Sequence, residues 1–496
     1  MALLFIWAIA LSYCVGSVWT SATCNQLATS GITIEPYESP AYDYDQTQYW
    51  SSACSALLPG CILVPDSAAQ VSLIVKTLLE NDEKFAIKSG GHNPNQNFSS
   101  VAGGPLINLK NLTEVTYDAE SGTARVGAGN RWSAVILALQ IYNVTVVGGR
   151  IGHVGVGGYL LGGGLSYLST QYGWAADNIV AAEVVLANGE IVNATETSNV
   201  DLFNVLRGGG NNFGIVTTYT LKTHPIGEIW GGIVVFESSP TVNDRILTAI
   251  RNFVEYYPDD KAAIIVTEEL TLASQQDIWL LFLFYDGPVP PPGTFDNITD
   301  IGPIVNTATT TTYYDFVSQE DAEVFMGDVY MIATESTSLP AADVGLEVLS
   351  SYRDHFVDVA TANAQVPGLV ATMAYQPIPK GLAVKALENG GDLIALDNFV
   401  DRIFFEFDYS FTSTASVPQM NGVIETLFSG IQERVSAFTA KGTLPEAYLP
   451  LFANDANFQE DYWGRLRPET LAYAEIVRDE YDPFGFFKDR TGGFKL

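Results

Sequence analysis

The chain has 496 residues, with 24 Lys and Arg against 56 Asp and Glu, so its formal net charge at pH 7 is −32. This length predicts two or more domains, and an apolar fraction of 47% excludes general disorder. Phosphate groups repel such an acidic chain, so we expect neither nucleic-acid binding nor adhesion to anionic membranes.

The N-terminus carries an apolar run over residues 2–22 that ends in the small residues Ser21 and Ala22. This pattern predicts a secretory signal peptide over residues 1–22, cleaved after Ala22. No further apolar run reaches membrane-spanning length, so we expect a secreted, extracellular protein. Five N-x-[ST] sequons support secretion: Asn97, Asn111, Asn143, Asn193 and Asn297.

Removal of the signal peptide leaves three cysteines, Cys24, Cys54 and Cys61. Outside the cell we expect one disulfide, and the pairings Cys24–Cys61 and Cys54–Cys61 both remain open. No C-x-x-C pair occurs and the four histidines are scattered, so we expect no metal site.

Strands and helices alternate up to about Pro225, which predicts an α+β domain. In chain order we expect a strand and helix over residues 62–80, a strand at Phe85–Lys88, a strand and turn at Ala124–Gly129, a helix at Trp132–Tyr142, and a hairpin around Asn188–Gly189.

From Gly232 onward the chain is rich in β-type runs, at Gly232–Phe236, Ile264–Val266, Ile278–Phe284 and Ile403–Phe411. They predict an antiparallel sheet with one packed face and one face that lines a cleft. A helix over Pro340–Phe356 is expected behind this sheet.

Glycine clusters between Lys88 and Thr217 are the strongest functional signal. They are Ser89–His92, Gly148–Gly149, Val154–Gly158 and Arg207–Thr217. Glycine lets a ligand lie against backbone amides, so several clusters indicate one large anionic ligand. Neither a P-loop nor a G-x-G-x-x-G fingerprint occurs, so the usual nucleotide cradles are not supported.

The order of these clusters, with Gln171–Asn178 between them, resembles the FAD-binding domain of the vanillyl-alcohol-oxidase superfamily, and the berberine-bridge-enzyme-like branch of fungal secreted oxidases in particular. The tail, with Phe452–Ala456 and its Gly-Gly-Phe ending, is also similar to that branch. The resemblance implies an α+β, two-domain flavoprotein. Its parts are an FAD-binding domain over 23–226, a substrate domain over 227–448, and a segment over 449–496 that returns to the first domain.

The resemblance also implies roles for individual residues. His92 is expected to bind the flavin covalently, and Ile151 replaces the cysteine that forms a second bond in many members, so we expect FAD attached once. Val154 is expected beside the reactive edge of the flavin, where a small side chain favours access of O2. The family pattern favours the Cys24–Cys61 disulfide and places Tyr172 near the substrate. Further expected cofactor contacts are Ser89, Gly90, Gly91, Asn93, Gly149, Gly155, Gly157, Gly158, Asn178, Gly214, Ile215, Val216 and Asn454.

A proton acceptor is expected on the strand Ile403–Phe411. Strand periodicity places Glu406, Asp408 and Ser410 on one face and four aromatic residues on the other. The two carboxylates would lie about 6–7 Å apart. Their mutual repulsion would then raise the pKa of one of them, which suits a general base.

Together these features predict a secreted, monomeric FAD oxidase. It would take a hydride from an alcohol, a phenolic or a related small molecule in an inter-domain cleft, with Glu406 or Asp408 as base, and pass electrons to O2 to give H2O2. A sugar or oligosaccharide oxidase, and a flavin-binding protein without turnover, are the alternatives.

Overall fold

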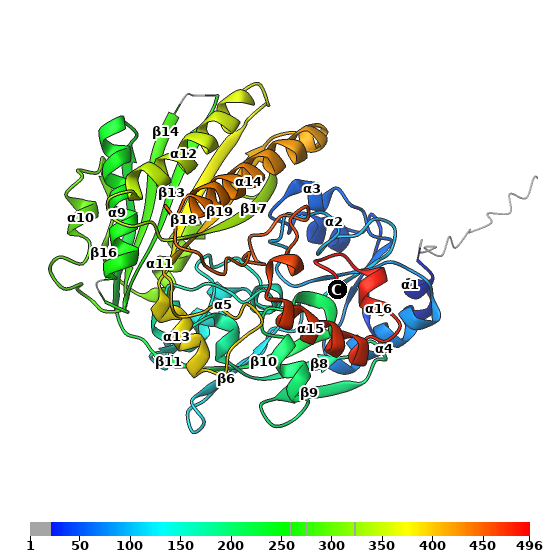
Figure 1. Ribbon diagram of the computed structural model, residues 1–496. Coiled ribbons are helices and arrows are strands. Elements are labelled where there is room, and N and C mark those ends of the chain that lie inside the picture. Colours follow the sequence, from blue (N-terminus) through cyan, green and yellow to red (C-terminus); the bar gives the residue numbers. More distant parts are fainter. Residues whose placement is uncertain (1–20, 258, 274–275, 322–323) are drawn as a thin grey trace, which may run out of the picture.

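The computed structural model describes residues 21–257, 259–273, 276–321 and 324–496. The expected signal peptide therefore lies outside the described residues, apart from Ser21 and Ala22. Within these ranges no helix is both long and apolar enough to cross a membrane. The first half of the chain forms a four-stranded sheet, a five-stranded sheet and a short two-stranded sheet (β11, His224–Pro225, with β7, Val144–Thr145), and a large sheet with its helices lies beside them (Figure 1).

The first sheet has the order β1–β2–β4–β3 and leads the chain to His92. Its strands are β1 (Thr33–Pro36), β2 (Cys61–Val64), β4 (Pro105–Asn108) and β3 (Ala86–Lys88). Helix α4 (Ala68–Glu80) follows β2, as expected, and buries its apolar stripe. The Cys24–Cys61 disulfide ties α1 (Ala22–Leu27) to the start of β2, which confirms the favoured pairing.

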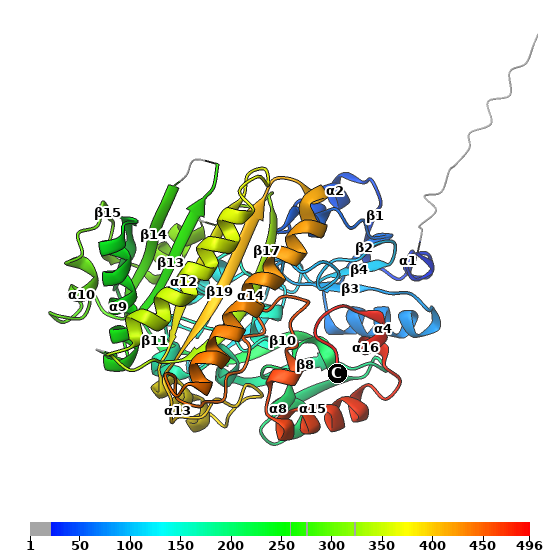
Figure 2. The ribbon, with the colours of Figure 1, turned by 45° about the horizontal axis from the view of Figure 1, so that its top comes forward.

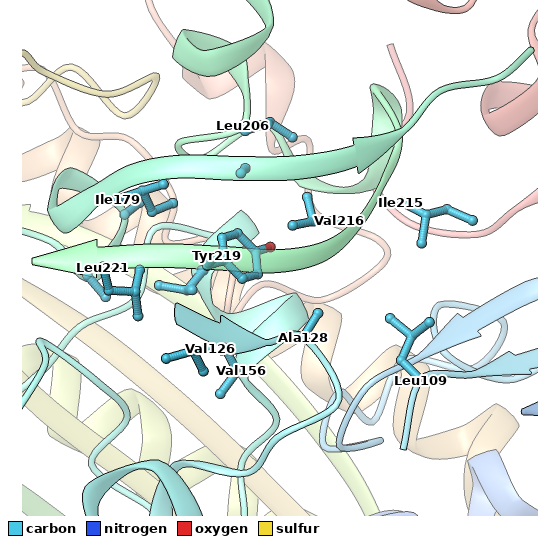
Figure 3. Packing of buried hydrophobic residues seen from close by; sticks show 14 of the residues in the cluster. Leu109, Val126, Ala128, Val156, Ile179, Leu206, Ile215, Val216, Tyr219 and Leu221 are labelled. Carbon is cyan, nitrogen blue, oxygen red and sulfur yellow. The ribbon is translucent and has the colours of Figure 1, made fainter. Parts of the chain in front are cut away.

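The second sheet is antiparallel and has the order β5–β6–β10–β8–β9. Its strands are β5 (Val115–Asp118), β6 (Thr123–Gly127), β10 (Ile215–Lys222), β8 (Ile179–Val185) and β9 (Ile191–Thr195). The β8–β9 pair is the hairpin expected around Asn188–Gly189. Side chains of β6 and β10 meet in the core shown in Figure 3. Leu109, Ile215 and Val216 belong to this core and also line a cavity of the protein.

The large sheet is antiparallel, with the order β15–β12–β14–β13–β18–β19–β17 and with β16 beside β12. Its strands are β12 (Ile229–Glu237), β13 (Ala262–Thr271), β14 (Gln276–Tyr285), β15 (Val305–Asn306), β16 (Thr309–Thr311), β17 (Val329–Ser338), β18 (Val370–Ile378) and β19 (Arg402–Phe411). Helices α9 (Pro240–Tyr256), α12 (Gly345–Ala362) and α14 (Val417–Ala440) cover one face (Figure 2). Helix α12 begins five residues later than expected, because Pro340 lies in the irregular connection after β17, where its carbonyl accepts a hydrogen bond from Arg251 Nε.

Strand β19 shows the alternation that the sequence predicts. Phe405, Phe407 and Tyr409 are fully buried in the core under α12 and α14. Glu406 and Asp408 lie on the opposite face, where they are largely buried but keep some exposure. That face is turned toward the first half of the chain, so the fold brings Glu406 to the cavity that the glycine loops also line.

The C-terminal tail lies against the first half of the chain. It contains α15 (Pro468–Tyr481) and α16 (Phe486–Arg490). Tyr462 OH donates to Gly208 O at 2.7 Å, and Asn212 Nδ2 donates to Phe494 O at 2.9 Å. These contacts join the end of the chain to the glycine loop before β10.

The remaining helices and short strands connect these layers. They are α2 (Pro40–Gln46), α3 (Ser52–Ser55), α5 (Trp132–Gln140), α6 (Val156–Leu161), α7 (Ser169–Tyr172), α8 (Val200–Val205), α10 (Asp296–Thr299), α11 (Tyr313–Glu320), α13 (Lys380–Glu388), β7 (Val144–Thr145) and β11 (His224–Pro225).

Candidate active site

A cavity of about 300 Å³ lies between the glycine loops and the large sheet. Its wall comes from the turn after β3, the segment 149–165, the loop before β10, and the C-terminal tail. Ile332 of β17 and Glu406 of β19 complete the wall. A cavity where three sheets and the C-terminal tail converge is the expected position for a ligand site.

Gly90 and Gly155 bring two of these loops into backbone contact. A Cβ added to Gly90 would lie 2.5 Å from Gly155 N, and one added to Gly155 would lie 2.6 Å from Gly90 Cα. No side chain is accommodated at such separations, so this contact requires glycine on both sides. Ser89 Oγ strengthens it, since it accepts from Gly157 N at 3.2 Å and donates to Ala128 O at 2.6 Å.

His92 lies on the cavity wall and stacks on Trp50, with ring centroids 4.4 Å apart. Its Nε2 atom is buried without a hydrogen-bond partner among the described residues. Burial, together with nearby His153 and Arg131, lowers the pKa of His92 well below 6.5. The imidazole is therefore neutral at ordinary pH, which is the nucleophilic form.

Glu406 faces the same cavity and lies beside a buried polar chain. Arg150 Nη2 is 3.9 Å from Glu406 Oε2 and donates to Gln376 Oε1 at 2.5 Å. Gln376 Nε2 in turn donates to Asp455 Oδ2 at 2.9 Å. Since Arg150 and Asp455 also line the cavity, one cation and two carboxyl groups meet at its sheet side.

The pKa values of these carboxyl groups are raised mainly by burial. Burial raises the pKa of Glu406 above 4.5, and the positive charge of Arg150 opposes that rise. Burial, and then the charges of Glu406 and Asp455, raise the pKa of Asp408 well above 3.8. Repulsion between the two strand carboxylates thus acts as expected on Asp408, but it is smaller than the effect of burial.

Most residues predicted for the site lie together on the cavity wall. They are Ser89, Gly90, Gly91, His92, Asn93, Gly149, Val154, Gly155, Gly157, Gly158, Gly214, Ile215, Val216, Glu406 and Asn454. Asp408, Tyr172 and Asn178 do not line it. Asp408 lies two residues along β19 and is paired with Ile332 of β17.

Tyr172 and Asn178 form a separate structural contact. The Tyr172 ring stacks on His224 with centroids 3.7 Å apart. Asn178 Nδ2 donates to the Tyr172 and Trp174 carbonyls, and its Oδ1 is 2.9 Å from His224 Nε2. These bonds occupy the polar groups of Asn178 and hold the end of α7 against β11, and neither residue reaches the cavity wall.

Three residues of the site were absent from the sequence prediction: Arg150, Asp455 and Gln376. Arg150 adjoins Gly149, and Asp455 adjoins Asn454, so two of them neighbour residues that the motifs do mark. Gln376 lies on β18, in a strand with no motif, and only its position beside β19 brings it to Arg150. A sequence signal existed for the first two and not for the third.

The cavity wall fits a flavin dinucleotide. Glycine loops expose backbone to a ligand along one side, as a large anionic cofactor requires. Leu109, Ile215 and Val216 supply an apolar patch for an aromatic ring system, and His92 offers a neutral imidazole. The fold and site thus define a flavin-dependent oxidoreductase.

Comparison with known proteins also indicates a flavin-dependent oxidoreductase. A sequence profile of the FAD binding domain matches residues 59–195. An uncharacterized FAD-linked oxidoreductase of Arthroderma benhamiae is 42% identical over 483 residues, which cover 97% of this chain and 96% of that protein. Further fungal relatives, 29–32% identical, are named FAD-dependent monooxygenases.

Two solved structures share the fold. Berberine bridge enzyme from Eschscholzia californica is 17% identical with a TM-score of 0.72, and the match covers 96% of this chain and 98% of that one. The glucooligosaccharide oxidase of Acremonium strictum is 21% identical with a TM-score of 0.75, covering 94% and 97%. The chain therefore belongs to the FAD-linked oxidoreductases and is an FAD-dependent enzyme, with the fold of berberine bridge enzyme.

Proposed function

We propose that the protein is an oxidase that holds FAD through one covalent bond to His92. It would take a hydride from a small organic substrate at a carbon that bears a hydroxyl or amine group. The observation that carries this proposal is the position of Glu406. This carboxyl group faces the cavity that His92 and the glycine loops also line, so it meets a substrate bound over the cofactor.

Glu406 is the proposed general base. Its pKa is raised by burial, yet Arg150 favours its ionised form, and a base of this kind is efficient near the working pH. Asp408 has the more strongly raised pKa and lies off the cavity wall, so it suits a protonated neighbour rather than the base. When bound, FAD accepts the hydride and passes two electrons to O2, which gives H2O2.

Two loop residues support the proposed single covalent link and oxygen access. Ile151 lines the cavity and supplies no sulfur for a second bond. Cys54, the free cysteine among the described residues, is buried and directs its Sγ toward the Asn93 and Pro94 carbonyls. Val154 also lines the cavity, and under this proposal its small side chain would leave room for O2 beside the cofactor.

Two other outcomes remain as alternatives with their own support. The fold is shared with a glucooligosaccharide oxidase, so sugars belong among the substrates to screen. Relatives named FAD-dependent monooxygenases make oxygen insertion a second outcome. Product analysis under ¹⁸O2 separates the two, since an oxidase leaves the label in H2O2 and a monooxygenase places it in the organic product.

The base assignment is tested by anaerobic reduction. Alcohols, phenols, amines and sugars are screened for H2O2, and the best substrate is mixed anaerobically with the enzyme. We expect Glu406→Gln to slow flavin reduction by about 10²–10⁴-fold, the usual contribution of a general base. Asp408→Asn is the matched control on the same strand and is expected to have a smaller effect. Unchanged reduction by Glu406→Gln would refute the assignment.

Secretion is part of the proposal. All five sequon asparagines (Asn97, Asn111, Asn143, Asn193 and Asn297) are exposed, which a glycan requires. The Cys24–Cys61 disulfide suits an oxidising compartment. Treatment of the protein from culture medium with an N-glycosidase is expected to lower its mass, and protein found only inside cells would contradict the proposal.

A further inference from the structure

His153 lies beside His92 but outside the cavity wall. The two ring centroids are 5.0 Å apart, with an angle of 33° between the rings. His92 lines the cavity, whereas His153 does not. The Nε2 atoms of both rings are buried, and neither has a hydrogen-bond partner among the described residues. A buried polar atom without a hydrogen bond destabilises the fold, so two such nitrogens in one contact indicate a functional role.

Asp321, at the end of α11, fixes the orientation of His153. Its Oδ1 atom is 3.0 Å from His153 Nδ1 and also accepts from the His153 backbone N–H at 2.9 Å. A carboxylate on Nδ1 holds the proton there and leaves Nε2 as the basic nitrogen. In this orientation the Nε2 atom of His153 carries the free lone pair and has no partner among the described residues.

Two neighbouring residues, Gly152 and Arg131, support the contact between His153 and Asp321. A Cβ on Gly152 would lie 2.7 Å from Asp321 Oδ2, so glycine is needed for the carboxylate to reach His153. Arg131 then ties the two histidine loops together, since its guanidinium donates to the His153 carbonyl and, at 3.0 Å, to the Gly90 carbonyl. Asp321, Gly152 and Arg131 thus hold His153 in a set position against the His92 turn.

We propose that the His153–Asp321 pair is the internal base that drives covalent attachment of the flavin to His92. This inference rests on the proposed covalent link. In the attachment step, an N–C bond forms between the His92 imidazole and the 8α carbon, while one N–H and one C–H bond break. His153 Nε2 would take the imidazole proton and the second proton would leave to solvent. The two electrons would reduce the flavin, and O2 would take them with two protons to give H2O2.

The same geometry argues against a role for His153 as the base that acts on the substrate. Substrate must lie in the cavity, which Glu406 lines and His153 does not. The contact of His153 is with the His92 ring and with Asp321. A base in this position acts on His92 itself, so its effect should appear in flavin attachment and not in substrate oxidation.

The test measures attachment directly. Wild type, His153→Gln, Asp321→Asn and the distant control His355→Gln are loaded with FAD, and acid-stable flavin is followed over time by precipitation and intact mass. We expect His153→Gln to bind FAD but to slow attachment by about 10²-fold or more, as loss of a general base does. Asp321→Asn should slow attachment less, and His355→Gln should match wild type.

Each other outcome has a defined meaning. Attachment at the wild-type rate in both His153→Gln and Asp321→Asn would overturn the inference. Loss of FAD binding by both variants would also overturn it, because the pair would then be structural. A wild-type protein without acid-stable flavin would instead refute the covalent link, which separates that failure from this one.

Discussion

Replacement of Arg150 by methionine tests whether the positive charge of Arg150 stabilises the ionised form of Glu406, the proposed base. Arg150 Nη2 is 3.9 Å from Glu406 Oε2, and both side chains are mostly buried. At this distance and an effective dielectric constant of about 20, Coulomb's law gives an attraction of about 4 kcal/mol, equivalent to about 3 pH units. Water that fills the space left by the guanidinium will screen part of this interaction. We therefore expect the acidic limb of the pH profile of kcat/KM to move by about 1–3 pH units.

The expected direction is toward higher pH. Arg150 stabilises ionised Glu406, so its removal raises the pKa of Glu406 further. Because the ionised carboxylate is the base, kcat/KM rises as the pH rises through that pKa. The acidic limb of the profile of kcat/KM against pH should therefore move to higher pH in Arg150→Met. Arg150→Lys keeps the charge and should move it less. A limb that stays in place in Arg150→Met would refute the pairing or the role of Glu406.

Three further predictions concern the loops and the disulfide. Gly155→Ala places a Cβ 2.6 Å from Gly90 Cα. We therefore expect weaker FAD binding, measured as visible absorbance per protein, and a loss of about 1–3 kcal/mol or more in the free energy of unfolding. An unchanged spectrum and Tm would contradict the loop contact. Val154→Leu should slow reoxidation by O2 in stopped flow while leaving anaerobic reduction nearly intact, and equal reoxidation rates would remove Val154 from the account. The Cys24→Ser, Cys61→Ser double variant opens a loop with a sequence separation of 37, so chain entropy predicts a loss of about 4 kcal/mol in denaturant unfolding; a loss below about 1 kcal/mol would show that this arm is held by other contacts.

Local patterns in the sequence predicted much of the fold. The alternation along Ile403–Phe411 was sufficient to assign the two faces of β19, because a strand places successive side chains on opposite sides. The β8–β9 hairpin followed from Asn188–Gly189, and α4 from its apolar spacing. The glycine clusters predicted the cofactor cavity because backbone contact requires glycine whatever the surrounding fold.

The parts that the sequence did not predict depend on long-range contacts. Gln376 reaches Arg150 only because β18 and β19 are neighbours in the large sheet. Asp321 meets His153 from a helix 168 positions away in sequence. Tyr172 was expected near the substrate, but its ring stacks on His224, a contact for which the sequence carries no local signal. The periodicity of a single segment cannot predict contacts between residues that lie far apart in the sequence.

The proposed function depends on a covalent flavin that His92 holds in the cavity that Glu406 faces. It is tested most directly by acid precipitation of the purified protein and of His92→Ala, with visible spectra of pellet and supernatant. We predict a yellow pellet for the wild type, and flavin in the supernatant alone for His92→Ala. Wild-type flavin that stays in the supernatant would contradict the covalent link, and a yellow pellet from His92→Ala would place the bond on another residue.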